Sequence, residues 1–361
     1  MQISMKIRGK LLQLKDSARR ALHGLFNKKK ITPTTAMARS RPEFIAFIAA
    51  LIITAGVLLL SQPWNKTPID GEAAAVQSLI SSDTEIFVDP FDRLVLSAKA
   101  AYVYDLKNDR VLFAKNENKP LPLASLVKVM TALVAMENIQ DSAVISIDAN
   151  SLRVEGDSGL FVGERWRVND LLDFTLLVSS NDGAHALATA AGEVMRTETN
   201  SRDLLPLELF INNMNDTSRR IGMYNTDFYN VTGLDEDESK AGAYGTAKDM
   251  AALFAYIINH RGSVLEGTIH SKKDFHSLDG INHTARNTNR SLMDIPSVVA
   301  SKTGYTELAE GNVVVAFDAG FGNPIIISVL GSGYDERFTD VANLTKATLE
   351  FLTREPKQLK I

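Results

Sequence analysis

The feature that most constrains this chain is one apolar run, Phe44 to Leu60, in which 17 consecutive residues carry no charge. As an α-helix the run would rise about 26 Å, close to the roughly 30 Å hydrocarbon thickness of a bilayer. Ser61, Gln62 and Trp64 would complete the span, because the amphipathic ring of tryptophan suits the membrane interface. We therefore expect a transmembrane helix over residues 44–62.

Two other interpretations of this run are weaker. A cleaved signal peptide would have a basic region of 43 residues, and no small-x-small cleavage site follows in the sequence LLLSQPWNK. A buried helix of a soluble core would not account for the charged segment that precedes the run.

Charge is distributed unevenly on the two sides of the run. Residues 1–43 contain 11 basic and two acidic residues, a net charge of +9, whereas the other 318 residues carry a net charge of −13. The positive-inside rule then predicts a single-pass protein of the cytoplasmic membrane, with residues 1–43 inside and the acidic body outside. An acidic body does not suit nucleic acid, which is bound through Lys and Arg contacts to phosphate. The absence of cysteine excludes disulfides, thiol nucleophiles and cysteine-ligated metal sites.

The chain divides into four predicted parts. Residues 1–43 form a basic cytoplasmic tail, which is either an amphipathic helix on the anionic inner leaflet or a solvated segment that only sets topology. Residues 44–62 form the membrane span, and 63–92, with prolines, small residues and weak periodicity, form a stalk. Residues 93–355 are long enough for one large domain.

The periodicity of this domain predicts an α+β fold. Two apolar runs, 100–104 and 111–114, flank Lys107-Asn108-Asp109 and predict a β-hairpin. Thr246 followed by Asp249 is typical of a capping box. Because a hairpin comes first and three strands come last, the sheet must join distant parts of the chain. Helices are expected over 126–136, 168–178, 184–195, 207–221, 246–259 and 339–353, and strands over 297–302, 312–318 and 325–331.

The pattern Ser125-x-x-Lys128 begins the first of these helices. Spacing of three residues places the hydroxyl and the amine on one helical face, within reach of each other. Serine needs a neighbouring base to act as a nucleophile, and lysine serves only if burial or a second cation lowers its pKa toward neutrality. Taken alone, however, this tetrapeptide is more often an ordinary helix start.

Two further patterns are equally ordinary in isolation. Ser179-Ser180-Asn181 falls in a break between two helices, where short polar side chains either cap a helix or point into a cleft. Lys302-Thr303-Gly304 is expected at the end of a strand, where glycine allows a ligand to approach the backbone or simply begins a turn. Together the three patterns form an ordered set, in which Ser179 follows Ser125 by 54 positions and Lys302 follows Ser179 by 123.

This ordered set is the signature of penicillin-binding proteins and serine β-lactamases. From about residue 98 to 351 the chain resembles the low-molecular-mass penicillin-binding proteins, the serine D-alanyl-D-alanine carboxypeptidases. The resemblance includes the stretches LLVSSNDGAHALA and SKTGYTELAEGN. It implies a β-lactamase-like fold, in which helices flank an antiparallel sheet beside an all-helical subdomain. It also implies peptidoglycan stem peptides as substrates, β-lactams as covalent inhibitors, and no metal or cofactor.

The resemblance also implies roles for individual residues. Ser125 would attack the penultimate D-alanine, with Lys128 as general base, and Ser179 would relay a proton to the leaving amine. Asn181 would hold the peptide backbone of the substrate. Lys302, as a fixed cation, and Thr303 would bind the terminal carboxylate. The oxyanion hole would use the backbone N–H groups of Ser125 and Tyr305, with Gly304 between Thr303 and Tyr305.

The chain departs from the family pattern at three points. Ser180 stands where glycine or aspartate is usual, and we expect it to point away from the cleft. Glu310 stands where a small residue is common, so it would alter the cleft wall. About 57 residues follow Gly304, too few for the extra β-rich domain that precedes the carboxyl-terminal anchor helix of the best-known members.

Other functions fit the sequence less well. A DD-endopeptidase would use the same residues, and a serine β-lactamase would need a deacylating glutamate in an E-x-x-L-N context, which the chain lacks. An inactive cell-wall binding module would not retain all the polar residues of the three patterns. Gly156-Asp157-Ser158-Gly159 imitates a trypsin-like nucleophile turn, but the preceding histidine, His23, lies on the far side of the membrane span.

Overall fold

The computed structural model describes residues 88–200 and 203–354. The expected tail and transmembrane helix, and the stalk up to residue 87, lie outside the described residues. None of the helices in the two described ranges has the length and hydropathy that a membrane span requires.

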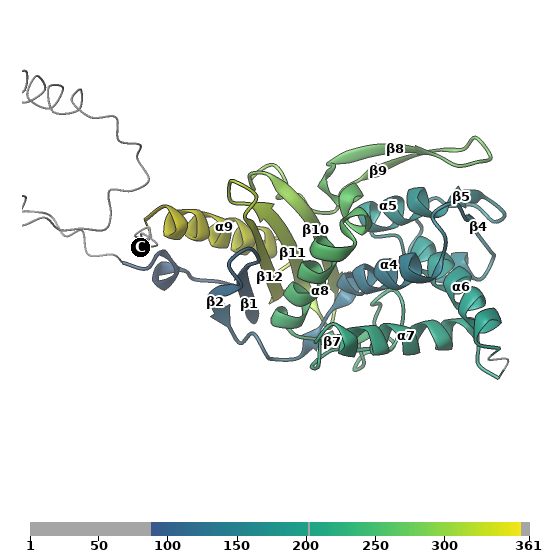
Figure 1. The fold of residues 1–361 in the computed structure, drawn as a ribbon, viewed down its shortest axis with the longest axis horizontal. Coiled ribbons are helices and arrows are strands. Elements are labelled where there is room, and N and C mark those ends of the chain that lie inside the picture. Colours follow the sequence, from purple (N-terminus) through teal and green to yellow (C-terminus); the bar gives the residue numbers. More distant parts are fainter. Residues whose placement is uncertain (1–87, 201–202, 355–361) are drawn as a thin grey trace, which may run out of the picture. The chain divides into compact units, whose positions relative to one another are not determined.

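The centre of the described part is a five-stranded antiparallel sheet with the strand order β10-β11-β12-β1-β2. In β1 the first residue, Ala100, lies opposite Leu330 of β12, so the earliest and latest strands are neighbours (Figure 1). The predicted joining of distant segments is therefore confirmed. The strands are β1 (Ala100–Asp105), β2 (Arg110–Lys115), β10 (Val298–Thr306), β11 (Glu310–Asp318) and β12 (Pro324–Ser332).

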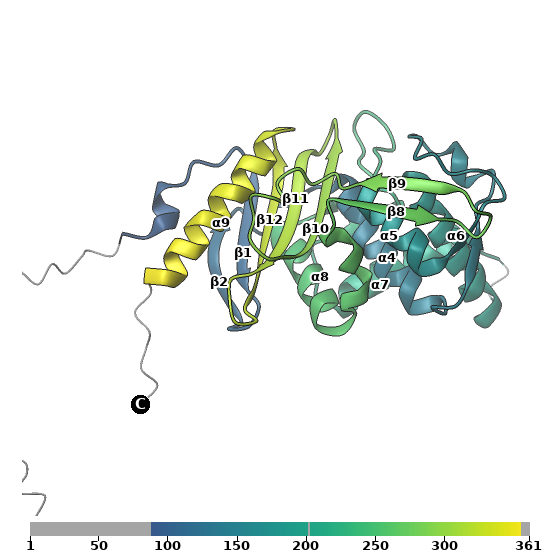
Figure 2. The same ribbon diagram turned by 90° about the horizontal axis from the view of Figure 1, so that it is seen from above.

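Both faces of the sheet are covered, which explains why its strands are apolar without interruption. Val313 and Val315 of β11 pack with Val341 and Leu344 of helix α9 (Glu336–Arg354), whereas the alternate residue Val314 joins the larger core on the opposite face. Figure 2 shows α9 along one face and α8 (Ala247–His260) on the other. The period-2 alternation of side chains thus divides the core into two clusters.

A helical part follows the first hairpin and lies beside the sheet. It is built around α4 (Val127–Asn138), whose first nine residues are all buried. Its other helices are α5 (Val168–Val178), α6 (Asn181–Glu198) and α7 (Pro206–Arg220). The six predicted helices are all present, and α5 has the predicted bounds because its apolar residues recur at helical steps. The predicted α+β class is confirmed.

Several short strand pairs do not follow from the sequence pattern. The hairpin of β8 (Lys272–His276) and β9 (Asn282–Arg286) extends along the helical part (Figure 1). A small three-stranded sheet contains β3 (Leu121–Pro122), β7 (Ala243–Gly245) and β6 (Asp227–Phe228), and β4 (Val144–Ser146) pairs with β5 (Arg165–Arg167).

The body begins before residue 93, where the sequence suggested a stalk. A 3-10 turn, Pro90–Arg93, places Phe91 in the buried cluster between α9 and the sheet, where it is 6% exposed. Its ring stacks on Phe113 at 5.4 Å and contacts Phe351 at 5.7 Å. The last residues of the predicted stalk are therefore part of the packed domain.

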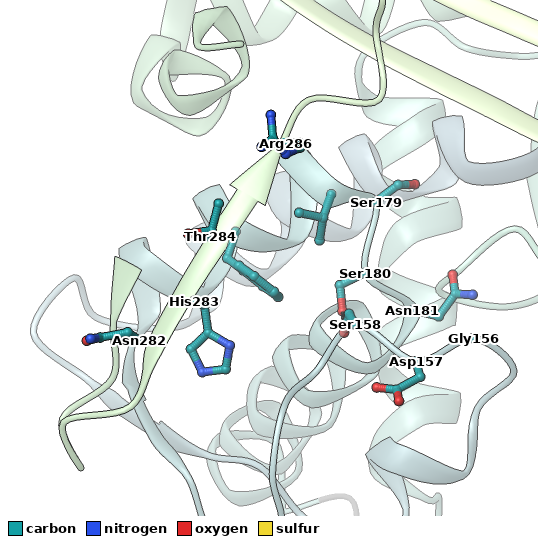
Figure 3. A pocket seen from close by; sticks show the side chains of 12 residues that line it. Gly156, Asp157, Ser158, Ser179, Ser180, Asn181, Asn282, His283, Thr284 and Arg286 are labelled. Carbon is teal, nitrogen blue, oxygen red and sulfur yellow. Dashed lines mark hydrogen bonds between the residues drawn. The ribbon is translucent and has the colours of Figure 1, made fainter. Parts of the chain in front are cut away.

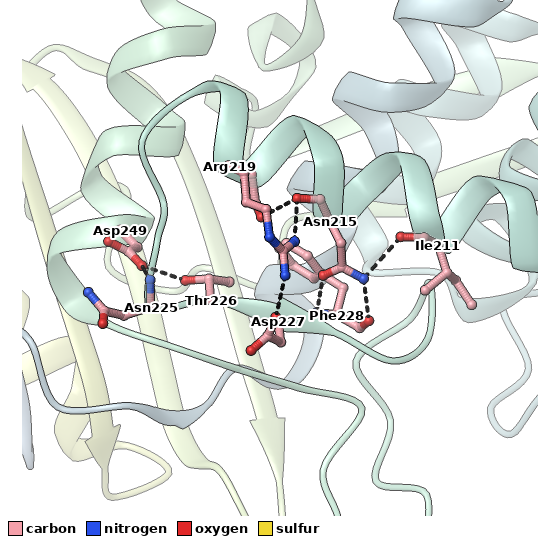
Figure 4. A network of polar contacts seen from close by, with 9 residues as sticks. Ile211, Asn215, Arg219, Asn225, Thr226, Asp227, Phe228 and Asp249 are labelled. Carbon is pink, nitrogen blue, oxygen red and sulfur yellow. Dashed lines mark hydrogen bonds and ion pairs between the residues drawn. The ribbon is translucent and has the colours of Figure 1, made fainter.

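The predicted capping box at α8 is half correct. Thr246 caps the helix, because its side chain accepts a hydrogen bond from the backbone N–H of Asp249. The carboxylate of Asp249 does not return to Thr246. It accepts from Asn225 N at 3.0 Å and from Thr226 Oγ1 at 2.8 Å, which ties the loop after α7 to the start of α8 (Figure 4).

Candidate active site

Ser125 lies in a short 3-10 turn, Ala124–Leu126, that leads directly into α4. Ala124 has a φ of 48°, in the left-handed region that residues other than glycine seldom adopt, so the backbone is strained one residue before Ser125. Lys128 follows three residues later, on the same side of the helix, and its Nζ is 2.9 Å from Ser125 Oγ. The hydroxyl and the amine predicted to act together are thus in hydrogen-bond contact.

Lys128 is held in an environment that disfavours its charged form. Its side chain is completely buried, and Nζ also donates a hydrogen bond to the carbonyl oxygen of Thr232 at 2.8 Å. Burial lowers the pKa of Lys128 well below its ordinary value, the charge of Lys302 lowers it further, and the carboxylate of Asp182 opposes both. The lowered pKa makes this amine easier to deprotonate than an ordinary lysine, and a deprotonated amine can accept a proton from Ser125.

Ser179 and Lys302 form a second hydroxyl–amine pair. Ser179 ends α5 in a left-handed conformation, with φ 62° and ψ 39°, and its Oγ accepts a hydrogen bond from Lys302 Nζ at 2.8 Å. Burial, followed by the charge of Arg337, lowers the pKa of Lys302 to about 7. The amine therefore titrates near neutral pH, and the role of a fixed cation that the resemblance implied for Lys302 stays a prediction.

The Lys302-Thr303-Gly304 pattern lies in the middle of β10 and not at its end. Lys302 pairs with Val314 of β11, and the strand continues to Thr306. A Cβ on Gly304 would lie 3.0 Å from the backbone nitrogen of Ser125. Glycine is needed here because any side chain would press β10 away from the backbone of Ser125.

Thr303 and Tyr305 flank this glycine. Thr303 Oγ1 is 2.6 Å from Thr288 Oγ1, so the two hydroxyls share a hydrogen bond. Tyr305 is 41% exposed, and its ring meets that of Tyr334 edge-on with 5.0 Å between the centroids. The strand thus carries one buried hydroxyl and one exposed ring on either side of Gly304.

Asn181 does not lie in a break between helices, because it is the first residue of α6. Its amide Nδ2 donates to the carbonyl oxygen of Glu155 at 2.6 Å, while Oδ1 is buried and has no hydrogen-bond partner in the described part of the chain. Ser180, which we expected to point away from the cleft, caps α6 by accepting from Gly183 N at 2.9 Å. Its hydroxyl oxygen also lies 2.6 Å from Ser158 Oγ.

Two cavities meet at Ser179. One, of about 600 Å³, opens beside Ser125 and is also lined by Thr303, Tyr305 and Arg337. The other, of about 610 Å³, lies between the loop of residues 156–158 and strand β9. Figure 3 shows this second cavity, with Ser158, Ser180 and Asn181 on one side and the β9 side chains on the other.

Comparison with known proteins identifies the family of the chain. Residues 89–333 match the Peptidase S11 family, described as D-alanyl-D-alanine carboxypeptidase. The chain belongs to this family. Because the match covers more than half of the chain and all three sequence patterns, the resemblance seen in the sequence is confirmed.

Individual relatives agree with this family. The chain is 29% identical over 243 residues to the D-alanyl-D-alanine carboxypeptidase DacF of Bacillus subtilis, a match that covers 66% of this chain and 58% of DacF. It is 28% identical over 232 residues to the D-alanyl-D-alanine endopeptidase of Haemophilus influenzae, covering 60% of this chain and 69% of that protein. The chain thus spans little more than half the length of DacF.

The fold has a match among solved structures. Penicillin-binding protein D2 of Listeria monocytogenes, in its cefotaxime-bound form, is 27% identical with a TM-score of 0.58, and the match covers 71% of this chain and 98% of that chain. The expected penicillin-binding-protein fold, an antiparallel sheet with flanking helices, is therefore confirmed for the S11 body.

The sequence patterns did not point to Arg337, which lies in the first turn of α9. Its side chain is buried, and Nη1 donates to the carbonyl oxygen of Gly304 at 2.7 Å, while Nε has no hydrogen-bond partner in the described ranges. The guanidinium also lies over the ring of Tyr334, 4.8 Å from its centroid. Since Arg337 belongs to none of the three patterns, only the packing of α9 on the sheet reveals its place beside Gly304.

Glu310 does not line the cavity beside Ser125. It begins β11 and pairs with Lys99 at 2.9 Å, with nearly half of each side chain exposed. The expected effect on the cleft wall is therefore not supported by the geometry. Across residues 88–200 and 203–354, we find no group of three or more acidic or histidine side chains able to hold a metal ion.

Proposed function

We propose that this S11 protein is a serine D-alanyl-D-alanine carboxypeptidase that removes the terminal D-alanine of peptidoglycan stem peptides through an acyl-enzyme on Ser125. The observation that carries the proposal is the buried amine of Lys128, 2.9 Å from Ser125 Oγ. An amine that is neutral at working pH can take the hydroxyl proton while the oxygen attacks a carbonyl.

In the first step, Ser125 Oγ forms a bond to the carbonyl carbon of the penultimate D-alanine and its proton passes to Lys128. The tetrahedral intermediate places negative charge on the carbonyl oxygen. The backbone N–H groups of Ser125 and Tyr305 would stabilise this charge, and the close approach of Gly304 to Ser125 N supports their convergence.

In the second step, the carbon–nitrogen bond breaks and the leaving amine of D-alanine needs a proton. That proton is the one Lys128 took from Ser125, and Ser179 is suited to relay it, because its Oγ is held by Lys302 Nζ at 2.8 Å. Lys128 is then neutral again, so it can accept a proton from the water that attacks the acyl-enzyme. That proton returns to Ser125 Oγ as the shortened peptide leaves.

The terminal carboxylate of the substrate would bind between Thr303 and Arg337. Both residues line the cavity that contains Ser125. Near neutral pH the guanidinium of Arg337 keeps its positive charge better than the amine of Lys302, whose pKa is about 7. Asn181, which lines the adjoining cavity, would contact the substrate backbone. β-Lactams would acylate Ser125 in the same way as the peptide.

The test incubates the protein with a peptide ending in D-Ala-D-Ala and measures released D-alanine, with Ser125→Ala as the paired variant. We expect release from the native protein alone. The proposal would be ruled out if Ser125→Ala released as much D-alanine as the native protein, or if the folded native protein released none. Fluorescent penicillin separates a carboxypeptidase, which stays labelled for minutes, from a β-lactamase, which loses the label quickly.

A cross-linked muropeptide dimer tests the endopeptidase alternative, which the name of the Haemophilus influenzae relative favours. An endopeptidase would cleave the D-alanyl cross-link at a rate comparable to release from the monomer. We expect monomer cleavage to dominate, and faster cleavage of the dimer would reassign the activity.

We also propose that residues 44–62 anchor the body to the cytoplasmic membrane with the body outside. The support is the uncharged run between a tail of net charge +9 and a body of net charge −13. Protease added to intact spheroplasts should digest the body. Complete protection of the body would contradict this topology.

A further inference from the structure

The loop that contains Gly156-Asp157-Ser158-Gly159 is tied to the first turn of α6. Three consecutive residues of that turn reach the loop: Ser180 Oγ lies 2.6 Å from Ser158 Oγ, Asn181 Nδ2 lies 2.6 Å from the carbonyl oxygen of Glu155, and Asp182 Oδ2 lies 2.7 Å from Ser158 Oγ. Figure 3 shows Ser158 next to Ser180, with Gly156 close to Asn181. One of these three residues, Asn181, belongs to the proposed substrate site.

The direction of the hydrogen bonds follows from counting donors. A carboxylate only accepts, so Ser158 donates its hydroxyl proton, and at 3.2 Å its backbone N–H, to Asp182 Oδ2. Because Ser158 uses its hydroxyl proton on Asp182, Ser180 must donate in the contact between the two serines, while its oxygen accepts from Gly183 N. The result is one chain, Ser180 to Ser158 to Asp182, in which Ser180 and Asp182 are each 2% exposed.

The same loop determines how the amide of Asn181 is turned. An atom 2.6 Å from a carbonyl oxygen must be a donor, so the nitrogen of the amide faces Glu155 and the oxygen faces away. Gly156 adopts a φ of +94°, and a Cβ there would lie 3.3 Å from Asn181 Nδ2. A displaced loop would therefore release the amide or crowd it.

We propose that Ser158, held by Ser180 and Asp182, is a positioning residue for the proposed reaction, because it fixes the loop whose Glu155 carbonyl orients Asn181. The inference rests on the proposed function of Asn181. It gives a purpose to the Gly-Asp-Ser-Gly pattern, which is not a nucleophile turn. It also explains why Ser180 suits this chain, since glycine at this position would remove the first hydroxyl of the chain of hydrogen bonds.

A double-mutant cycle tests whether Ser158 acts through Asn181. The full-length protein and its Ser158→Ala, Asn181→Ala and doubly substituted variants are compared by kcat/KM for a D-Ala-D-Ala peptide. We expect Ser158→Ala to lower kcat/KM about tenfold, mainly through KM, as expected for one misplaced polar contact. In the Asn181→Ala background the same substitution should change kcat/KM by less than about twofold.

Two matched comparisons separate positioning from general stability. Ser218→Ala removes a buried hydroxyl far from the loop, which donates to Asn215 O at 2.8 Å within α7, and should leave kcat/KM unchanged. Ser158→Thr and Ser158→Val have nearly the same shape, but only threonine keeps the hydroxyl. The threonine variant should retain most of the native kcat/KM and the valine variant should not, even if Ser158→Ala fails to fold.

The outcomes are distinct from those of the proposed function. The inference would be overturned if Ser158→Ala lowered kcat/KM by the same factor in the Asn181→Ala background as in the native protein. Equal kcat/KM of the Ser158→Thr and Ser158→Val variants would also overturn it. If the native protein releases no D-alanine, the proposed carboxypeptidase activity fails instead. The cycle is then measured on the rate of Ser125 acylation by fluorescent penicillin, with the same expected coupling.

Discussion

Lys302 Nζ lies 2.8 Å from Ser179 Oγ while the charge of Arg337 acts on the same amine. One lysine therefore contacts the proposed proton relay and also borders the proposed carboxylate site. Its pKa of about 7 places its titration near neutral pH.

Peptide binding should weaken as pH rises through about 7. The pKa of Lys302 is lowered in the folded protein, so above that pH the amine loses the proton that would help to bind a carboxylate. Arg337→Gln should move this transition to higher pH, because it removes the charge that lowers the pKa of Lys302. The pH profile of kcat/KM measures the shift, and Arg165→Gln, a surface substitution, serves as the control.

Lys128→Met should stabilise the protein while abolishing acylation of Ser125. Burial lowers the pKa of Lys128, so folding carries a cost wherever the unfolded lysine, with its ordinary pKa of 10.5, is still protonated. Methionine has no such cost, and we expect Tm to rise by about 2–4 °C at pH 7. The advantage should shrink as pH rises toward 10, where the unfolded lysine also loses its proton. A Tm difference that grows with pH would contradict this explanation.

Gly304→Ala should slow acylation without unfolding the body. The added Cβ would lie 3.0 Å from Ser125 N and 3.0 Å from Leu123 O, so the turn that carries Ser125 must shift. We expect the rate of penicillin acylation to fall at least about tenfold, since a proposed oxyanion donor is displaced. Gly262→Ala, where a Cβ meets nothing within 4 Å, is the matched control and should acylate normally.

Asp249→Ala should lower stability and leave the proposed active site intact. The carboxylate is buried and holds Asn225 N and Thr226 Oγ1, so its removal leaves two donors without their acceptor. We expect a loss of about 2 kcal/mol, or about 4–8 °C in Tm, measured by thermal unfolding. Asp249→Asn, which keeps an acceptor oxygen, should lose less. A larger loss for asparagine than for alanine would refute the proposed network.

The long elements of the fold follow from local pattern, and the short ones do not. Helix α5 has the bounds that its apolar spacing predicts, and the central strands β11 and β12 are continuous apolar runs. The β8–β9 hairpin was missed because most of its residues are polar and exposed. Its inward residues, Phe275 and His283, pack on the ring of Trp166, a contact that only the tertiary structure supplies.

The proposed site shows the same division. The spacing of Ser125 and Lys128 within one helix start implies their contact, and the structure places the two atoms 2.9 Å apart. Ser179 and Lys302 meet only in the tertiary structure, where the 3-10 turn Glu266–Ile269 packs against both α5 and β10. Arg337 belongs to no pattern, since its place depends on how α9 lies on the sheet.

The pairing of β1 with β12 imposes an order on folding. Residues 100 and 330 are direct neighbours, so the sheet cannot close until nearly the whole body has been synthesised. Closing a loop of this length is slow, because its entropy is lost before the contact is gained. Until β12 is made, the edge of β1 that will pair with it has no partner strand. A chain that stops before β12 would expose that edge to other chains.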